Sequence, residues 1–184
     1  EAREGGSFRE RAATIERRYG SRFKRLLVTV HPADIPGELP GKGSNLAWAG
    51  RQAQAYVDEL RVPYEDVIVT TLDADTCLHP TYFSYLTFRY LTHPRPTRTS
   101  FQPVPLYNNN IWESPALMRV VANSTTFWLL TELMRPDRLF TFSSHSMSLR
   151  ALVDVDFWEK DIVTEDSRIF LQGFIRYSGD YTVT

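Results

Sequence analysis

The chain has 184 residues, of which 42% are hydrophobic and 23% are charged, and its formal net charge at pH 7 is −1. This is an ordinary globular composition at a length that typically forms one domain, so we expect a single domain over residues 1–184. With this charge balance, nothing indicates the basic surface of a nucleic-acid-binding protein. The single cysteine excludes an internal disulfide, and no apolar run approaches the ~18 residues of a membrane span.

The first 43 residues predict a helix, a strand and a long loop. Residues 7–19 predict a charged helix that ends at Gly20. Residues 25–31 predict a strand, and the loop from Pro32 to Gly43 is rich in Pro and Gly. That loop is longer than a plain connector, so we expect it to be either functional or mobile. Because the chain opens at Glu1 and not at Met, we expect a piece of a longer protein.

A second helix is predicted from Ser44, as its N-cap, to about Leu60. The run Gly41-Lys42-Gly43-Ser44-Asn45 brings a cation and backbone N–H groups to the helix N-terminus, which is a natural anion site. The four-residue spacer of a phosphate-binding loop is absent, so a plain turn is the alternative.

The run from Val67 to Leu72 is β-branched or apolar and lacks strict alternation, as is typical of a central parallel strand covered on both faces. It ends at Asp73-Ala-Asp75. Ligands of open α/β sheets bind just outside the carboxyl ends of the strands. Two carboxylates there suit a hard divalent cation that also contacts substrate phosphates. For an isolated Asp-x-Asp, a capped and solvated turn is the alternative.

The second half of the chain alternates further strands and helices. An aromatic helix is predicted over residues 82–91, a strand over 99–104, and a polar loop over 108–113 whose amides either bind sugar hydroxyls or serve as ordinary loop residues. A long helix over 115–134 has a broad apolar surface that we expect in the core, with a partner or membrane surface as the alternative.

The last elements are a strand over residues 141–148 and a helix that Thr164 caps and Gly179 ends. Glu165 and Asp166 lie in the first turn of that helix, where simple charge–dipole complementarity is the alternative to a functional role. Since strands alternate with helices, we expect an α/β fold with a mostly parallel central sheet flanked by helices.

Taken in order, five segments resemble motifs of processive family-two glycosyltransferases, with cellulose-synthase-like and other membrane-anchored enzymes nearest in pattern. The segments are Gly41-Lys-Gly-Ser-Asn45, the strand ending Asp73-Ala-Asp75, Phe101-Gln-Pro103, Ser143-Ser-His-Ser-Met-Ser-Leu-Arg150 and Thr164-Glu-Asp166. The resemblance covers residues 25–178 and implies the GT-A nucleotide-sugar transferase fold. The family's first strand has no counterpart, because residues 1–24 read as a charged helix, and its Gln-x-x-Arg-Trp acceptor motif is absent.

The resemblance implies inverting, metal-dependent transfer of a sugar from a nucleoside-diphosphate donor. Lys42, Asn45, Asp73 and Asp75 match residues that bind the donor, and Asp75 also matches the ligand of Mg²⁺ or Mn²⁺. The parent would be a membrane protein that makes a polysaccharide or glycolipid, with this chain as its cytoplasmic domain and the membrane contact made by other parts of the parent.

On the acceptor side, Asp166 matches the general base that takes the proton of the acceptor hydroxyl, with Glu165 beside it. Ser144 and His145 lie where the family places the wall of the acceptor site, and the acceptor would be a sugar or a lipid-linked molecule. The alternative for His145 is a structural role, as a hydrogen-bonded histidine that does not contact the acceptor.

Two other functions stay open. The chain could be a non-catalytic module that binds a sugar or a partner through the helix over 115–134 and the loop at Asn108. Alternatively, Asp73, Asp75, Glu165 and Asp166 could serve a metal-dependent phosphohydrolase.

Overall fold

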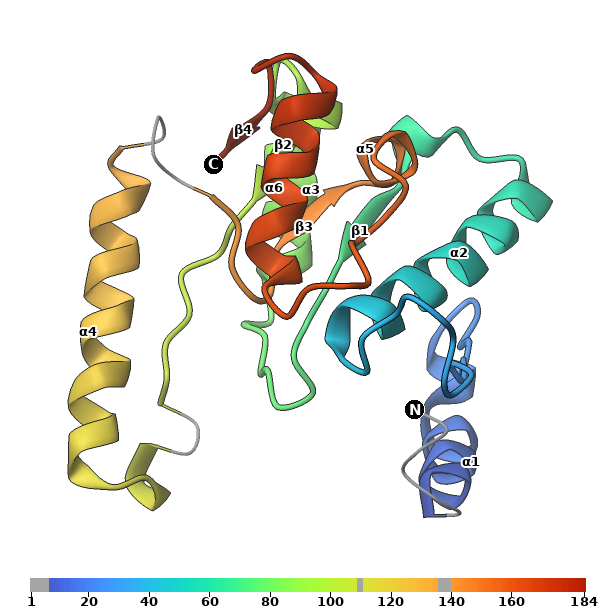
Figure 1. The fold of residues 1–184 in the computed structure, drawn as a ribbon, viewed down its shortest axis with the longest axis horizontal. Helices are drawn as coiled ribbons and strands as arrows, with labels where there is room; N and C mark the ends of the chain where they lie inside the picture. Colours follow the sequence, from blue (N-terminus) through green and yellow to red (C-terminus); the bar gives the residue numbers. More distant parts are fainter. Residues whose placement is uncertain (1–6, 109–110, 136–139) are drawn as a thin grey trace. The chain divides into compact units, whose positions relative to one another are not determined.

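The computed structural model describes residues 7–108, 111–135 and 140–184. They form α/β structure, in which helices accompany a small four-stranded mixed sheet (Figure 1). The chain divides into two compact units. The first unit contains residues 1–62 and 157–165, and the second unit contains residues 63–156 and 166–184. The expectation of a single domain over the whole chain stays a prediction.

The described part of the first unit contains helices and no strand. The helix predicted over residues 7–19 is confirmed as α1 (Ser7–Tyr19), and a short 3-10 helix, η2 (Gly20–Arg22), follows it. The strand predicted over residues 25–31 is wrong, and Leu27, Val28 and Val30 in that stretch are 38% to 43% exposed. A strand needs a neighbouring strand for its hydrogen bonds, and the local apolar pattern cannot supply one.

Helix α2 (Lys42–Leu60) begins two residues before the predicted Ser44. Gly41 is its N-cap residue, and the Ser44 hydroxyl donates instead to the carbonyls of Leu39 at 2.6 Å and Lys160 at 3.2 Å. The prediction of Ser44 as the cap is therefore wrong. The helix ends at the predicted place, where Arg61 adopts a left-handed conformation with φ of 54°.

The sheet lies in the second unit and has the strand order β1-β3-β2-β4. The strands are β1 (Ile68–Thr70), β2 (Thr99–Phe101), β3 (Ser146–Ser148) and β4 (Thr182–Val183). Strand β3 is antiparallel to both β1 and β2, and only the pair of β2 and β4 is parallel. The predicted mostly parallel sheet is therefore wrong, and β1 is an edge strand of half-buried residues instead of a central one. An unalternating β-branched run indicates covered faces, but it does not specify the neighbour or its direction.

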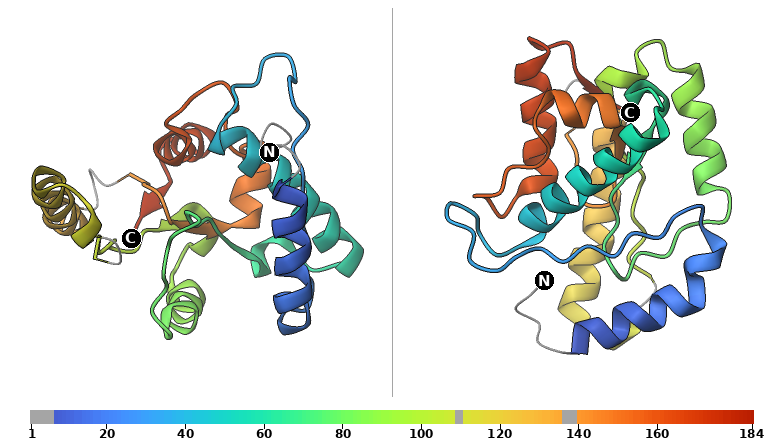
Figure 2. Two further views of the ribbon diagram at one scale, coloured as in Figure 1. Left: turned by 90° about the horizontal axis from the view of Figure 1, so that it is seen from below. Right: turned by 90° about the vertical axis from the view of Figure 1, so that its right-hand side faces the viewer.

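Helices α3 (Tyr82–Thr92) and α6 (Glu165–Arg176) lie on opposite faces of this sheet (Figure 2, left). On the α3 face, Leu86 and Tyr90 pack against Phe101 of β2. Each such buried side chain contributes about 1.5–3 kcal/mol to stability. On the α6 face, the Ser100 hydroxyl hydrogen-bonds the Tyr181 hydroxyl at 2.8 Å. The sheet is thus the middle layer of the second unit.

Helix α5 (Leu149–Asp154) directly follows β3 and was not predicted from the sequence. The Ser148 hydroxyl caps it by accepting a hydrogen bond from the backbone N–H of Arg150 at 3.1 Å. The remaining short elements are the 3-10 helices η3 (Tyr64–Asp66), η4 (Pro96–Arg98) and η5 (Ile111–Glu113).

Helix α4 (Ala116–Leu133) confirms the long helix predicted over residues 115–134. The expectation that its apolar surface lies in the core is wrong for most of its length, because Leu129 is its one described residue that is buried. Leu129 packs against Val183 of β4, while Leu117, Phe127 and other apolar residues of α4 are exposed. Within the described ranges, no helix combines the length and the apolarity needed to cross a bilayer.

Candidate functional site

The loop after β1 carries two exposed carboxylates, Asp73 and Asp75. The chain leaves the sheet at Thr71, whose backbone N–H donates to the carbonyl of His145 at 3.0 Å. A turn follows, in which the N–H of Thr76 donates to the carbonyl of Asp73 at 3.0 Å. Both carboxylates therefore stand at the carboxyl end of β1, on a backbone that is tied to the sheet.

The segment before β3 contacts this acidic loop through its hydroxyl groups. The Ser143 hydroxyl donates to the Asp73 carboxylate, and the hydroxyls of Ser144 and Thr76 lie 3.2 Å apart. Ser144 has a positive φ of 64°, a conformation that is uncommon for residues other than glycine. This local backbone directs the two neighbouring hydroxyls toward the loop of Asp73.

The His145 side chain is buried, with 1% of the residue exposed. Its Nδ1 donates to the carbonyl of Phe142 at 2.8 Å, which selects the tautomer with the proton on Nδ1. The same nitrogen lies 3.9 Å from Oδ1 of Asp166, beyond hydrogen-bond length. His145 therefore lies beside Asp166 without a hydrogen bond from this nitrogen to it.

Asp166 lies in the first turn of α6, and its side chain is 18% exposed. Its backbone carbonyl accepts a hydrogen bond of 2.5 Å from the Thr141 hydroxyl. The segment over residues 141–145 thus contacts both acidic clusters, with Ser143 on the Asp73 loop and Thr141 on the start of α6. Within the second unit, these contacts bring the two clusters to one short stretch of chain.

The other residues predicted for the site belong to the first unit. Lys42 and Asn45 lie in the first turn of α2, and Glu165 is buried, with 4% exposed. A Cβ added to Gly43 would come within 2.7 Å of the Glu159 carbonyl and 3.1 Å of the Glu165 Cβ. The N-terminus of α2 therefore packs closely on the Glu159–Glu165 stretch, and only glycine fits there.

The long Pro/Gly loop of the first unit is anchored by an ionic contact. The Glu38 carboxylate accepts hydrogen bonds from the Lys160 ammonium at 2.6 Å and from His31 Nε2 at 2.8 Å. The Lys160 hydrogen bond is the largest influence and, together with that from His31, it outweighs burial and holds the pKa of Glu38 below its usual value. The backbone N–H of Leu39 also donates to the Lys160 carbonyl at 2.7 Å.

Sequence analysis missed the residue that holds the segment at 141–145 in place. Gln102 is 5% exposed, and its Oε1 accepts a hydrogen bond from the Phe142 N–H at 2.8 Å. Its Nε2 donates to the carbonyls of Pro103 at 3.0 Å and Ser143 at 3.4 Å. The Phe101-Gln-Pro103 segment was noticed as a motif, but the partner of its amide lies 40 positions away along the chain.

The acidic loop fits a divalent cation only in part. Across the ranges that the structure describes, no three His, Cys, Asp or Glu side chains gather closely enough to hold a metal ion. Mg²⁺ commonly binds proteins through one or two carboxylates and completes its coordination with water and substrate phosphates. Asp73 and Asp75 supply this smaller set of hard oxygen ligands.

Comparisons of this chain with protein-family models, with curated proteins and with solved structures find no match.

Proposed function

We propose that this chain is the catalytic core of an inverting, metal-dependent glycosyltransferase of GT-A type, which transfers a sugar from a nucleoside diphosphate to an acceptor hydroxyl. One observation carries the proposal. The Ser143 hydroxyl donates to the Asp73 carboxylate, and the Thr141 hydroxyl, two positions earlier, donates to the backbone carbonyl of Asp166 in the other acidic cluster. This spacing supports one pocket in which donor and acceptor meet.

Asp166 is the proposed general base. Its carboxylate accepts the proton of the acceptor hydroxyl while that oxygen forms a bond to the anomeric carbon and the bond to the diphosphate breaks. A single displacement of this kind inverts the anomeric centre. A well-placed carboxylate typically contributes about 10²–10⁴-fold to such a step. The partial exposure of the Asp166 side chain, against the burial of Glu165, favours Asp166 in this role.

The donor is assigned to Lys42, Asn45, Asp73 and Asp75. Asp75, with Asp73 beside it, is the proposed ligand of Mg²⁺ or Mn²⁺, which when bound offsets negative charge on the leaving diphosphate. Lys42 and Asn45 at the N-terminus of α2 are the proposed contacts to the donor, because a cation and helix N–H groups favour anions. Glu165 is assigned beside the base, and Ser144 and His145 are assigned to the wall of the acceptor site.

The parent protein, in this proposal, is a membrane-anchored enzyme that makes a polysaccharide or glycolipid. Its cytoplasmic part would contain this chain, and segments outside the chain would contact the membrane.

Calorimetric titration with uridine and guanosine diphosphate tests the donor site. Mn²⁺ or Mg²⁺ is expected to tighten binding of one of them by about tenfold or more. Asp75→Ala should remove this gain, whereas Asp66→Ala, at an exposed aspartate of η3, should keep it. A loss of affinity in Asp75→Ala that is equally large with chelator would contradict the metal role.

Asp166→Asn tests the base in the full-length protein. We expect transfer to fall by about 10²–10⁴-fold while donor affinity stays within about twofold. Full turnover by this variant would exclude Asp166 as the base.

A non-catalytic module that binds a sugar or a partner is the second candidate. The exposed apolar residues of α4 favour it, because monomeric proteins rarely expose many large apolar side chains together. Failure of every nucleotide to bind in the presence of metal would favour this candidate over the transferase.

A further inference from the structure

Helix α4 exposes a row of large apolar side chains. Five of them are between 44% and 75% exposed: Leu117, Val120, Val121, Phe127 and Trp128. With full areas on the order of 200 Å² each, they present roughly 600 Å² of apolar surface. The largest apolar patch on a typical monomer measures ~300–600 Å², so the exposed row on α4 lies at the upper end of that range. Its area is also most of the ~800 Å² of surface that each partner buries in a standard protein–protein interface.

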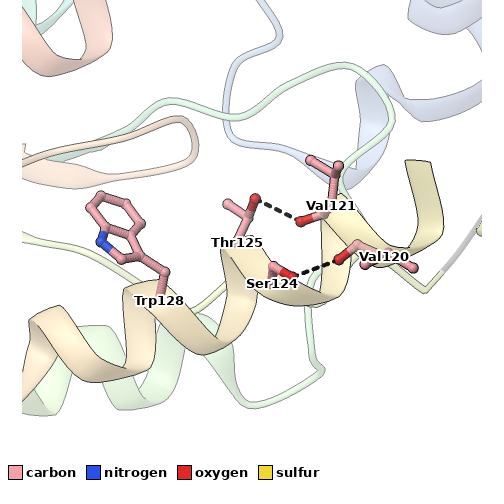
Figure 3. A pocket seen from close by; sticks show the side chains of 5 residues that line it. All are labelled: Val120, Val121, Ser124, Thr125 and Trp128. Atoms are coloured by element: carbon pink, nitrogen blue, oxygen red, sulfur yellow. Dashed lines mark hydrogen bonds between the residues drawn. The ribbon is translucent and has the colours of Figure 1, made fainter. Parts of the chain in front are cut away.

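A shallow groove of about 310 Å³ lies within this row. Its lining residues are Val120, Val121, Ser124, Thr125 and Trp128 (Figure 3). The small side chains of Ser124 and Thr125 form the middle of the groove, with the two valines one turn before them and the Trp128 indole one turn after them.

The hydroxyls in the groove already have acceptors on their own helix. Ser124 donates to the carbonyl of Val120 at 2.8 Å, and Thr125 donates to that of Val121 at 3.0 Å. Covering the groove with apolar side chains would therefore leave neither hydroxyl proton without an acceptor, which removes the main penalty for burying them. The groove thus suits an apolar occupant.

We propose that this occupant is α4 of a second copy of the chain, packed antiparallel about a two-fold axis that passes between Ser124 and Thr125. Trp128 and Val121 lie equally far from this axis along the helix, on opposite sides of it. In such a pair, the indole of each copy fills the valine end of the other copy's groove, and the small residues let the two helices approach closely. One patch then serves both partners, as a two-fold interface requires.

The charges of α4 favour a protein partner over a lipid surface. Helices that lie on membranes typically carry several Lys and Arg residues on a polar face. The 18 residues of α4 contain no lysine and one arginine, Arg119. Its guanidinium donates to the carbonyls of Ser114 at 2.9 Å and Trp112 at 3.0 Å, so it is directed to the chain's own backbone. The pairing does not depend on the proposed transferase activity.

Ser124→Lys tests the pairing without disturbing the buried side of α4. In the pair, the two introduced ammonium groups would meet near the axis, and we expect the dissociation constant of the dimer to rise by at least about 100-fold. The matched control is Asn123→Lys, which adds the same charge to an exposed residue about 100° around the helix and outside the groove. Sedimentation velocity over a concentration series gives the mass of each species.

The wild-type chain and Asn123→Lys are expected to reach twice the 21.3 kDa mass of one chain, whereas Ser124→Lys stays at that mass. A wild-type monomer at every concentration would overturn the proposal, and so would a dimer that Ser124→Lys leaves unchanged. A wild-type monomer that instead co-sediments with phosphatidylcholine–phosphatidylserine vesicles would overturn it in favour of a lipid surface.

Crosslinking provides a second test that does not depend on dissociation. In a Cys77→Ala background, Ser124→Cys treated with diamide should form a disulfide-linked dimer, and Asn123→Cys should not. Equal crosslinking of both variants would mean random collision and would overturn the proposed packing.

Discussion

Gln102 is the most informative residue to replace, because its side-chain amide holds the segment over residues 141–145 that contacts both acidic clusters. In Gln102→Leu the side chain keeps its approximate volume but loses three hydrogen bonds, at 2.8, 3.0 and 3.4 Å, to the backbone of Phe142, Pro103 and Ser143. A buried polar group left without its partner costs about 1–3 kcal/mol, and the 3.4 Å contact contributes little. We therefore expect the free energy of unfolding of the second unit to fall by about 2–4 kcal/mol.

Urea unfolding followed by circular dichroism measures this change from the shift of the midpoint at an unchanged slope. Gln52→Leu, at an exposed position of α2, is the matched control and should change stability by no more than about 0.5 kcal/mol. Amide hydrogen exchange gives the local measurement, since the Phe142 N–H loses its acceptor and its protection should fall by about 5- to 150-fold. Unchanged protection of that amide would refute the assignment of Gln102 as its partner.

Two further predictions concern the first unit. Gly43→Ala would force a Cβ to within 2.7 Å of the Glu159 carbonyl, a backbone atom that cannot rotate away, so we expect a loss of about 1–3 kcal/mol in thermal unfolding. Gly20→Ala, with no atom within 4 Å of the added Cβ, should show no such loss. For Glu38, the Lys160 hydrogen bond lowers the pKa in the folded state, so the unfolded state binds more protons as the solution is acidified. The ionised Glu38 carboxylate therefore stabilises the folded state above pH 4.5, the ordinary pKa of a glutamate, and this stabilisation is lost as the pH falls through the lower pKa of the folded state. In a plot of urea midpoint against pH, Glu38→Gln should flatten this acidic part of the curve.

The helices were predictable because their signals lie close together in the chain. Residues 7–19, 82–91 and 115–134 carry helical spacing over several turns, and α1, α3 and α4 form there. Helix α5 was missed because its six residues follow β3 without a break, in a stretch that reads as continuing strand. The apolar surface of α4 was misassigned to the core, since periodicity indicates an apolar face but not what covers it.

The candidate site was predictable as a set of residue types but not as a set of contacts. Asp73, Asp75 and Asp166 were chosen because acidic residues follow a strand or begin a helix. Nothing near them in sequence indicates that Ser143 and Thr141 supply the hydroxyls that tie the two clusters to one segment. Such partners lie 25 to 70 positions away, where local pattern carries no information.

The sequence by itself determined where this chain forms its longer helices, that the fold contains both α and β elements, and which carboxylates stand at the ends of those elements. These features depend on neighbours within one or two turns. Only the tertiary structure decided that β1 is an edge strand paired antiparallel with β3, that Gln102 holds the backbone at Phe142, and that α4 leaves its apolar face exposed. The reason is that strand pairing, buried amide hydrogen bonds and the cover of a helix face are all formed between distant parts of the chain.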